Sequence, residues 1–211
     1  MAIKLQKGQT INLEKGLYTL SQVTVGLGWD VRQAPPKGML GRLLSGQQED
    51  EDYDLDAVAF LLDESGKVRN LGEKLVGGDV IFFNNLQHPS GTIWLTGDNR
   101  TGAGEGDDEQ IIVRLDAMSP AVQRILFVVQ IYQGKQKNQH FGMVENAFIR
   151  AVDAKGTEMA RYDISGDASF NGKCSMIFAE VYRKGADWKF RAIGDPQETD
   201  SFVDILRNYV R

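Results

Sequence analysis

The sequence is poor in the residues that build disulfides, soft-metal centres and membrane spans. Its 211 residues include one cysteine, Cys174, which cannot form an internal disulfide, and two histidines, His88 and His140. So few thiol and imidazole ligands disfavour a zinc or copper centre. No apolar run approaches the roughly 20 residues that a membrane-spanning helix requires, so we expect no direct insertion into a membrane.

Positive charge is also scarce. The chain carries 24 Lys and Arg against 29 Asp and Glu, for a formal net charge of -5. A nucleic-acid binder needs a basic face that displaces counterions from phosphate, so this class is disfavoured. The first residues, MAIKLQKGQTINLEKG, lack the apolar segment of a signal peptide, and we therefore expect a cytoplasmic protein.

Short apolar runs separated by turn residues predict an all-β fold. In LSQVTVGLGW, residues 20–29, Val23, Val25, Leu27 and Trp29 recur at period two, as they do on one face of a strand. Turn residues separate such runs at the intervals typical of a two-sheet β-sandwich. Further strands are predicted within 54–62, 80–83, 92–96, 110–115, 125–132, 147–152, 158–164, 174–183 and 188–193, the last four as two hairpins.

Helical signals are few. Ser119-Pro120 predicts the start of a short helix, with serine as the cap and proline at the first position. At the C-terminus, apolar residues recur at i, i+3, i+4 and i+7 from Phe202 to Tyr209, which predicts a helix over 199–210 that packs on the sandwich. Residues 33–52, rich in proline and glycine, are predicted to be a loop inserted into a single domain of residues 1–211.

The strongest chemical signal is the segment GDNRTGAGEGDDE at residues 97–109. It holds five carboxylates against one cation, Arg100, while Asn99 and Thr101 add neutral oxygens. Its glycines let the backbone turn carbonyl oxygens inward. Calcium takes 6 to 8 oxygens in flexible geometry and suits such a loop better than magnesium, which requires a stricter octahedron. The alternative interpretation is a solvated acidic loop.

A second group of carboxylates lies near strand ends. Asp30 follows Trp29 at the end of one predicted strand, and Asp54 and Asp56 share a face of the next strand with large apolar residues. Carboxylates at the end of a buried strip are costly unless they are paired or bound to a metal. Pairing with a cation such as Arg32 is the alternative to metal binding.

Several of these motifs occur together in one known family. The chain resembles the TerD family of tellurite-resistance and stress-response proteins over about residues 3–195, through GLGWD (26–30), DLDAVAFLL (54–62), FFNNL (82–86), TGDNRTGAGEGDDE (96–109) and ARYDI (160–164). The resemblance implies a β-sandwich that binds two calcium ions near one end. The ligands it implies are Asp30, Asp54, Asp56, Asp98, Asn99, Thr101, Glu105, Asp107, Asp108 and Glu109, with Asn85 as a second-rank candidate.

The resemblance also implies a function. It indicates a calcium-binding, non-enzymatic protein of tellurium resistance and of the response to chemical and phage stress, acting with other ter proteins that include a membrane partner. We expect a module whose surface calcium orders for interaction or sensing, or a scaffold that holds calcium permanently. The alternative from a different class is a metal-dependent hydrolase that uses the same carboxylates, although the sequence contains no nucleophile motif such as GxSxG.

Overall fold

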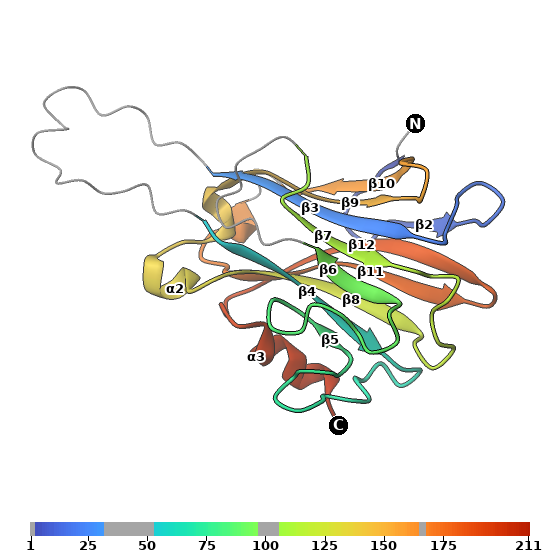
Figure 1. The fold of residues 1–211 in the computed structure, drawn as a ribbon. Helices are drawn as coiled ribbons and strands as arrows, with labels where there is room; N and C mark the ends of the chain where they lie inside the picture. The colour runs from blue at the N-terminus through green and yellow to red at the C-terminus, as the bar shows by residue number, and fades with distance from the viewer. Residues whose placement is uncertain (1–2, 32–52, 97–105, 165–167) are drawn as a thin grey trace, which may run out of the picture.

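A computed structural model describes residues 3–31, 53–96, 106–164 and 168–211. These residues form two six-stranded sheets that face each other as a β-sandwich (Figure 1), as the sequence predicts. The predicted insertion at 33–52 lies outside the described residues. The strands are β1 (Ile3–Lys4), β2 (Thr10–Leu13), β3 (Val23–Val31), β4 (Leu55–Leu62), β5 (Val80–Ile81), β6 (Ile93–Thr96), β7 (Glu109–Val113), β8 (Arg124–Ile131), β9 (Val144–Val152), β10 (Glu158–Asp163), β11 (Ser175–Lys184) and β12 (Asp187–Gln197).

The strand order places sequence-distant segments side by side. The first sheet runs β1-β10-β9-β3-β7-β6 and the second runs β2-β12-β11-β8-β4-β5. Both predicted hairpins are present, as the antiparallel pairs β9-β10 and β11-β12. The short edge strands β1 and β2, which the sequence analysis missed, pair with β10 in parallel and with β12 in antiparallel orientation.

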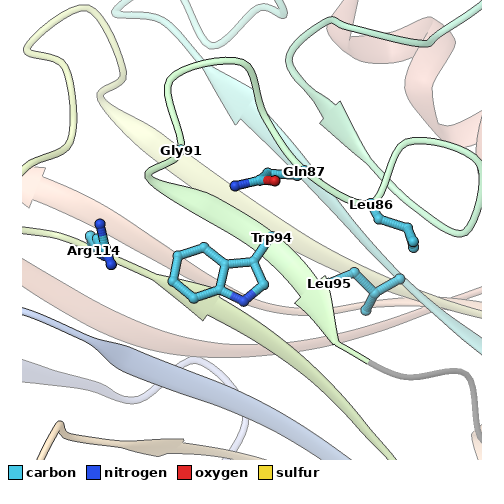
Figure 2. Close-up of a pocket in the computed structure, with 6 residues that line it drawn as sticks. All are labelled: Leu86, Gln87, Gly91, Trp94, Leu95 and Arg114. Atoms are coloured by element: carbon cyan, nitrogen blue, oxygen red, sulfur yellow. The ribbon is translucent and has the colours of Figure 1, made fainter.

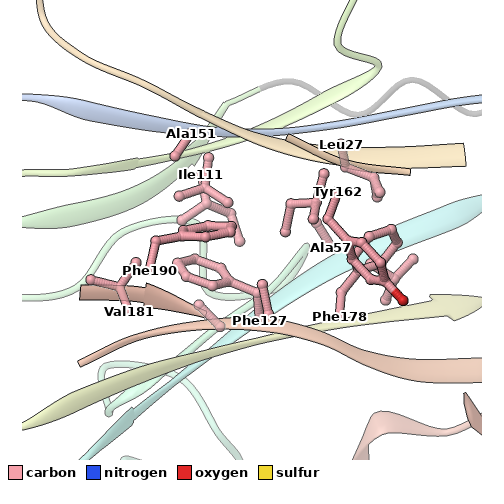
Figure 3. Packing of buried hydrophobic residues seen from close by; sticks show 14 of the residues in the cluster. Leu27, Ala57, Ile111, Phe127, Ala151, Tyr162, Phe178, Val181 and Phe190 are labelled. Atoms are coloured by element: carbon pink, nitrogen blue, oxygen red, sulfur yellow. The ribbon is translucent and has the colours of Figure 1, made fainter. Parts of the chain in front are cut away.

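The main core lies between the sheets (Figure 3). Residues 23, 25, 27 and 29 of β3 are all buried in it, which confirms the period-two prediction. From the second sheet, Phe127, Phe178 and Phe190 are almost fully buried. Rings of this size contribute much of the hydrophobic stabilisation of a sandwich.

The strand β4 is buried on both faces. Its odd-numbered residues, 55 to 61, face the main core, whereas Val58, Phe60 and Leu62 belong to a second apolar cluster on the outer side of the sheet. The C-terminal helix α3 (Phe202–Leu206) covers that outer side, and the 3-10 turn η3 (Arg207–Tyr209) continues it. The predicted C-terminal helix is therefore present, with a shorter α-helical part.

The predicted helix at Ser119-Pro120 was wrong. The segment is a turn, in which Ser119 accepts a hydrogen bond from the Val122 amide at 3.0 Å. Gln123 then donates its amide to the carbonyl of Leu62 at 2.8 Å, so the chain enters β8 before a helical turn can propagate. The described residues instead contain a four-residue helix, α2 (Gly134–Lys137), and the 3-10 turns η1 (Phe141–Met143) and η2 (Ala168–Phe170).

Cys174 is a packing residue in this fold. Its side chain is buried, and its thiol donates a hydrogen bond to the carbonyl oxygen of Gln139 at 3.3 Å. Burial raises the pKa of the Cys174 thiol, which disfavours the reactive thiolate.

Candidate metal centre

One end of the sandwich gathers most of the described carboxylates predicted as ligands. There β3 ends, β4 begins and β7 begins (Figure 1). In the register of β3 and β7, Leu27 lies opposite Glu109, so Asp107 and Asp108 lie beside the last residues of β3. We call this region the acidic end and define it by Asp30, Asp54, Asp56, Asp107, Asp108 and Glu109.

Glu109 crosses the interior and joins the two sheets. It is 3% exposed and accepts a hydrogen bond from the backbone N–H of Ala57, on the opposite sheet, at 2.5 Å. On the same edge of β4, the amide of Leu61 donates to the backbone carbonyl of Asp79, and the pairing with β5 ends where Ile81 lies opposite Ala59. Ala57 lies beyond the end of β5, so the carboxylate of Glu109 takes the place of a missing strand.

Asp108 extends the pairing of β7 with β3. Its amide donates to the carbonyl of Leu27 at 2.8 Å, and its Oδ2 accepts the amide of Trp29 at 2.9 Å. The indole of Trp29 is 2% exposed, and its Nε1 has no hydrogen-bond partner in the described residues. The carboxylate of Asp108 is therefore held where the pairing of β7 with β3 begins.

The side chain of Asp107 packs directly over Gly26. A Cβ added to Gly26 would lie 2.1 Å from Asp107 Oδ2, so only glycine leaves room for the carboxylate. Arg150 donates from Nε to Asp107 Oδ1 at 2.7 Å, and Gln110 donates to Oδ2 at 3.3 Å. The hydrogen bond that Arg150 donates to Asp107 raises the pKa of the Arg150 guanidinium, whose cation offsets part of the negative charge here.

The second glycine of the GLGWD motif has a related role. A Cβ at Gly28 would lie 2.4 Å from the ring of Phe148 and 2.7 Å from the carbonyl oxygen of Gly106. The guanidinium of Arg161 also packs on that ring, 3.6 Å from its centroid. In this motif, apolar residues that face the core therefore alternate with glycines, and the glycines leave room for other side chains to pack against the outer face of the strand.

Asp30 and Asp54 lie at the strand ends themselves. Asp30 is exposed and accepts a hydrogen bond from Asn146 Nδ2 at 2.7 Å. Asn146 has φ +51°, the left-handed conformation that asparagine tolerates better than most residues. Asp54 is half-buried, and its carbonyl oxygen accepts the amide of Tyr132 at 2.7 Å.

Asp56 shares a face of β4 with Val58, as the sequence predicts, and in the structure that face is the outer side of the second sheet. It is buried and accepts a hydrogen bond from Gln130 Nε2 at 2.8 Å. Gln130 Oε1 in turn accepts the amide of Phe202, the first residue of α3, at 2.6 Å. Asp56 is thereby linked to the C-terminal helix, and this link could have been suspected from the single polar residue in the apolar run ILFVVQIY.

Asn85 lies in the connection after β5, and its amide is used within that connection. Its Oδ1 accepts the amide of Gly77 at 3.1 Å, and its Nδ2 donates to the carbonyls of Val80 at 2.6 Å and Gly78 at 3.4 Å. Four predicted ligands, Asp98, Asn99, Thr101 and Glu105, lie outside the described residues. Among the residues that are described, no three His, Cys, Asp or Glu side chains converge as a metal-binding group.

No helix in the described part of the chain is both long and apolar enough to cross a bilayer. Comparison with known proteins gives a consistent picture. The TerD domain model matches residues 1–209. The chain is 55% identical to tellurium resistance protein TerX of Serratia marcescens and 41% identical to stress response protein SCP2 of Bacillus subtilis (strain 168), each over the whole of both chains.

A solved structure has the same fold. A homologue of the telluride resistance protein TerD from Streptomyces coelicolor superposes with a TM-score of 0.61 at 23% identity, covering 87% of this chain and 94% of that one. At this identity the likeness concerns the fold alone.

Proposed function

Because this chain belongs to the TerD family, whose named members include tellurium-resistance and stress-response proteins, we propose that it is a calcium-binding, non-enzymatic interaction module of such a response. It acts in the cytoplasm, and its partners are other ter proteins, including one embedded in a membrane. Two calcium ions bind at the acidic end and order the surface that a partner contacts.

The observation that carries the proposal is the convergence of β3, β4 and β7 on one carboxylate-rich end. The described candidates there offer only oxygen atoms, which suits a hard cation. Protein donors orient four of them: Asn146 for Asp30, Gln130 for Asp56, Arg150 for Asp107 and the Trp29 amide for Asp108. Calcium, when bound, would supply positive charge that offsets the repulsion among these carboxylates.

The residues of the acidic end have two roles: some stabilise the fold there, and others bind the ion. Glu109 ties the start of β7 to β4 of the other sheet, and Asp108 ties it to β3 within its own sheet. Asp30 and Asp54, which are more exposed, stand at the strand ends where an ion from solvent arrives first. We therefore assign them, with the acidic loop, the main part in binding calcium.

The test is calcium titration of chelator-stripped protein by calorimetry and thermal unfolding. Calcium at 100 times its dissociation constant stabilises the folded state by about 2.7 kcal/mol per site, which corresponds to roughly 5–10 °C in a protein of this size. Asp30→Asn and Asp54→Asn should each reduce the calcium-induced shift by at least half, and magnesium should give a much smaller shift. Asp187→Asn, in the β11-β12 hairpin at the opposite end, is the matched control.

Two results would contradict the proposal. If metal-free, folded protein shows neither heat nor a shift in melting temperature with calcium, the acidic end is a solvated surface. If the protein turns over phosphate esters and Asp54→Asn abolishes that turnover, the carboxylates serve a hydrolase instead.

A further inference from the structure

Two side chains in the connection from β5 to β6 form a chain of hydrogen bonds with Asp79, the residue just before β5. His88 Nε2 lies 3.0 Å from Asp79 Oδ1, and His88 Nδ1 lies 2.7 Å from Ser90 Oγ. The side chains of His88 and Asp79 are 17% and 16% exposed, whereas Ser90 is exposed. The sequence contains no nucleophile motif such as GxSxG, and only the fold brings Asp79 to His88.

The backbone fixes the direction of these hydrogen bonds. The amide of Ser90 donates to His88 Nδ1 at 3.1 Å, so Nδ1 carries the lone pair and Nε2 carries the proton. Nε2–H therefore donates to Asp79, and the hydroxyl of Ser90, whose oxygen lies 2.7 Å from both His88 Nδ1 and Thr92 Oγ1, can donate to either atom. The hydroxyl of Thr92, 2.7 Å from Ser90 Oγ, and its amide, at 3.3 Å, both reach the same oxygen.

A hollow of about 490 Å³ is lined in part by Gln87 and Gly91, which flank this turn in the sequence (Figure 2). It is lined by Leu86, Gln87, Gly91, Trp94, Leu95 and Arg114. The guanidinium of Arg114 lies 5.4 Å from the centroid of the Trp94 ring. The hollow thus offers an apolar floor for a small acyl group and one cation for an oxygen that gains negative charge.

We propose that Ser90 is a nucleophile that accepts an acyl group from small carboxylic esters, with His88 as general base and Asp79 as the residue that positions the imidazole. This activity goes beyond the proposed interaction function and does not depend on calcium, and it limits the non-enzymatic part of that proposal to the acidic end. In serine hydrolases, one imidazole nitrogen accepts the serine proton while a carboxylate accepts a hydrogen bond from the other nitrogen. The same arrangement is found here, with the roles of the two nitrogens exchanged.

The reaction balances with water as the only co-reactant. Ser90 Oγ forms a bond to the acyl carbon while its proton passes to His88 Nδ1, and the bond from the acyl carbon to the ester oxygen breaks as that oxygen takes the proton. Water then attacks the acyl carbon, gives one proton through Nδ1 to the departing Ser90 Oγ, and leaves a carboxylic acid. The products are one alcohol and one acid.

The chain supplies its own control serine. Ser65 is also exposed, and its Oγ donates to Asp63 Oδ1 at 2.6 Å, but its described hydrogen bonds include no histidine. If a carboxylate or a turn sufficed to activate a hydroxyl, both serines would react alike. General-base assistance predicts that Ser90 reacts about 100-fold faster than Ser65.

The experiment is acetylation by p-nitrophenyl acetate in the presence of chelator, followed by peptide mass spectrometry. The expected result is a burst of p-nitrophenol close to one equivalent, with acetyl on Ser90 and about 100-fold less on Ser65. Ser90→Ala should abolish the burst. His88→Ala should slow it to the Ser65 rate, and added imidazole should partly restore it, which a purely structural histidine would not show.

Asp79 is tested separately because it also has a structural role: its carboxylate accepts a hydrogen bond from the Asn70 amide at 2.9 Å, in the connection between β4 and β5. Asp79→Asn should slow acetylation at least tenfold and change its pH profile, while Asp79→Glu should retain more of the rate. Circular dichroism melting of each variant establishes that it is folded. Equal labelling of Ser90 and Ser65 in the folded wild type, or no response of labelling to His88→Ala, would overturn the proposal and leave the chain of hydrogen bonds as a lock on this turn.

Discussion

Substitution of Glu109 distinguishes most clearly between a carboxylate that stabilises the fold and one that only binds a metal. Glu109→Ala leaves the buried Ala57 amide without its acceptor, which costs about 1–3 kcal/mol, and it opens a cavity between the sheets. We expect a total loss of about 2–4 kcal/mol in the free energy of unfolding without calcium. Glu109→Gln keeps the volume and an acceptor oxygen and loses only the charge, so it should cost about 1 kcal/mol.

The assay is equilibrium urea unfolding in the presence of a chelator, followed by tryptophan fluorescence. Glu158→Ala is the matched control, because Glu158 forms a partly exposed ion pair with Arg150 on the surface and its removal should cost no more than about 1 kcal/mol. If Glu109→Ala unfolds within about 0.5 kcal/mol of wild type without calcium, then Glu109 does not join the sheets in solution and the reasoning from its contact with Ala57 is wrong.

Three further predictions concern other parts of the molecule. Gly28→Ala should destabilise the protein by about 1–3 kcal/mol in urea unfolding, because its Cβ overlaps the Phe148 ring, and a neutral effect would contradict that contact. Burial acts to raise the pKa of Asp153, but hydrogen bonds from three backbone amides outweigh it and lower the pKa. The difference in the free energy of unfolding between wild type and Asp153→Asn should therefore shrink as pH falls below about 4, and a difference that stays constant with pH would refute this. Phe202→Ala should cost about 3–5 kcal/mol in thermal unfolding, since its ring packs 5.1 Å from that of Phe82 and anchors α3, and a loss under 1 kcal/mol would show that the helix is not anchored there.

The architecture links the acidic end to the C-terminal helix. Asp56 lies at one end of β4 and accepts a hydrogen bond from Gln130 Nε2, while Gln130 Oε1 accepts the first amide of α3. A satisfied buried network of this kind rigidifies the structure around it. Asp56 therefore serves the packing of the second sheet whether or not it also contacts an ion.

Much of this fold could be predicted from the order of residues alone. Alternation in β3 and the apolar run of β8 gave strands in the correct places, because the period of a strand is imposed by its backbone. The periodic apolar residues after Ser201 likewise gave the C-terminal helix. Ser119-Pro120 carried a helix-start signal as well, but the pairing of the next residues with β4 prevented it, since tertiary hydrogen bonds outweigh weak local propensity.

For the candidate site, composition and spacing determined the chemistry of the acidic residues, whereas their positions depended on the fold. No local pattern indicates that Glu109 reaches across the interior, that Asp107 sits over Gly26, or that Asp79 meets His88. Each of these contacts joins residues that are 9 to about 80 positions apart, and strand order and register alone bring them together. The sequence by itself determined which atoms are available for binding and catalysis, and only the tertiary structure decided which of them meet, because side-chain contacts across a sandwich are fixed by how its sheets pair and pack.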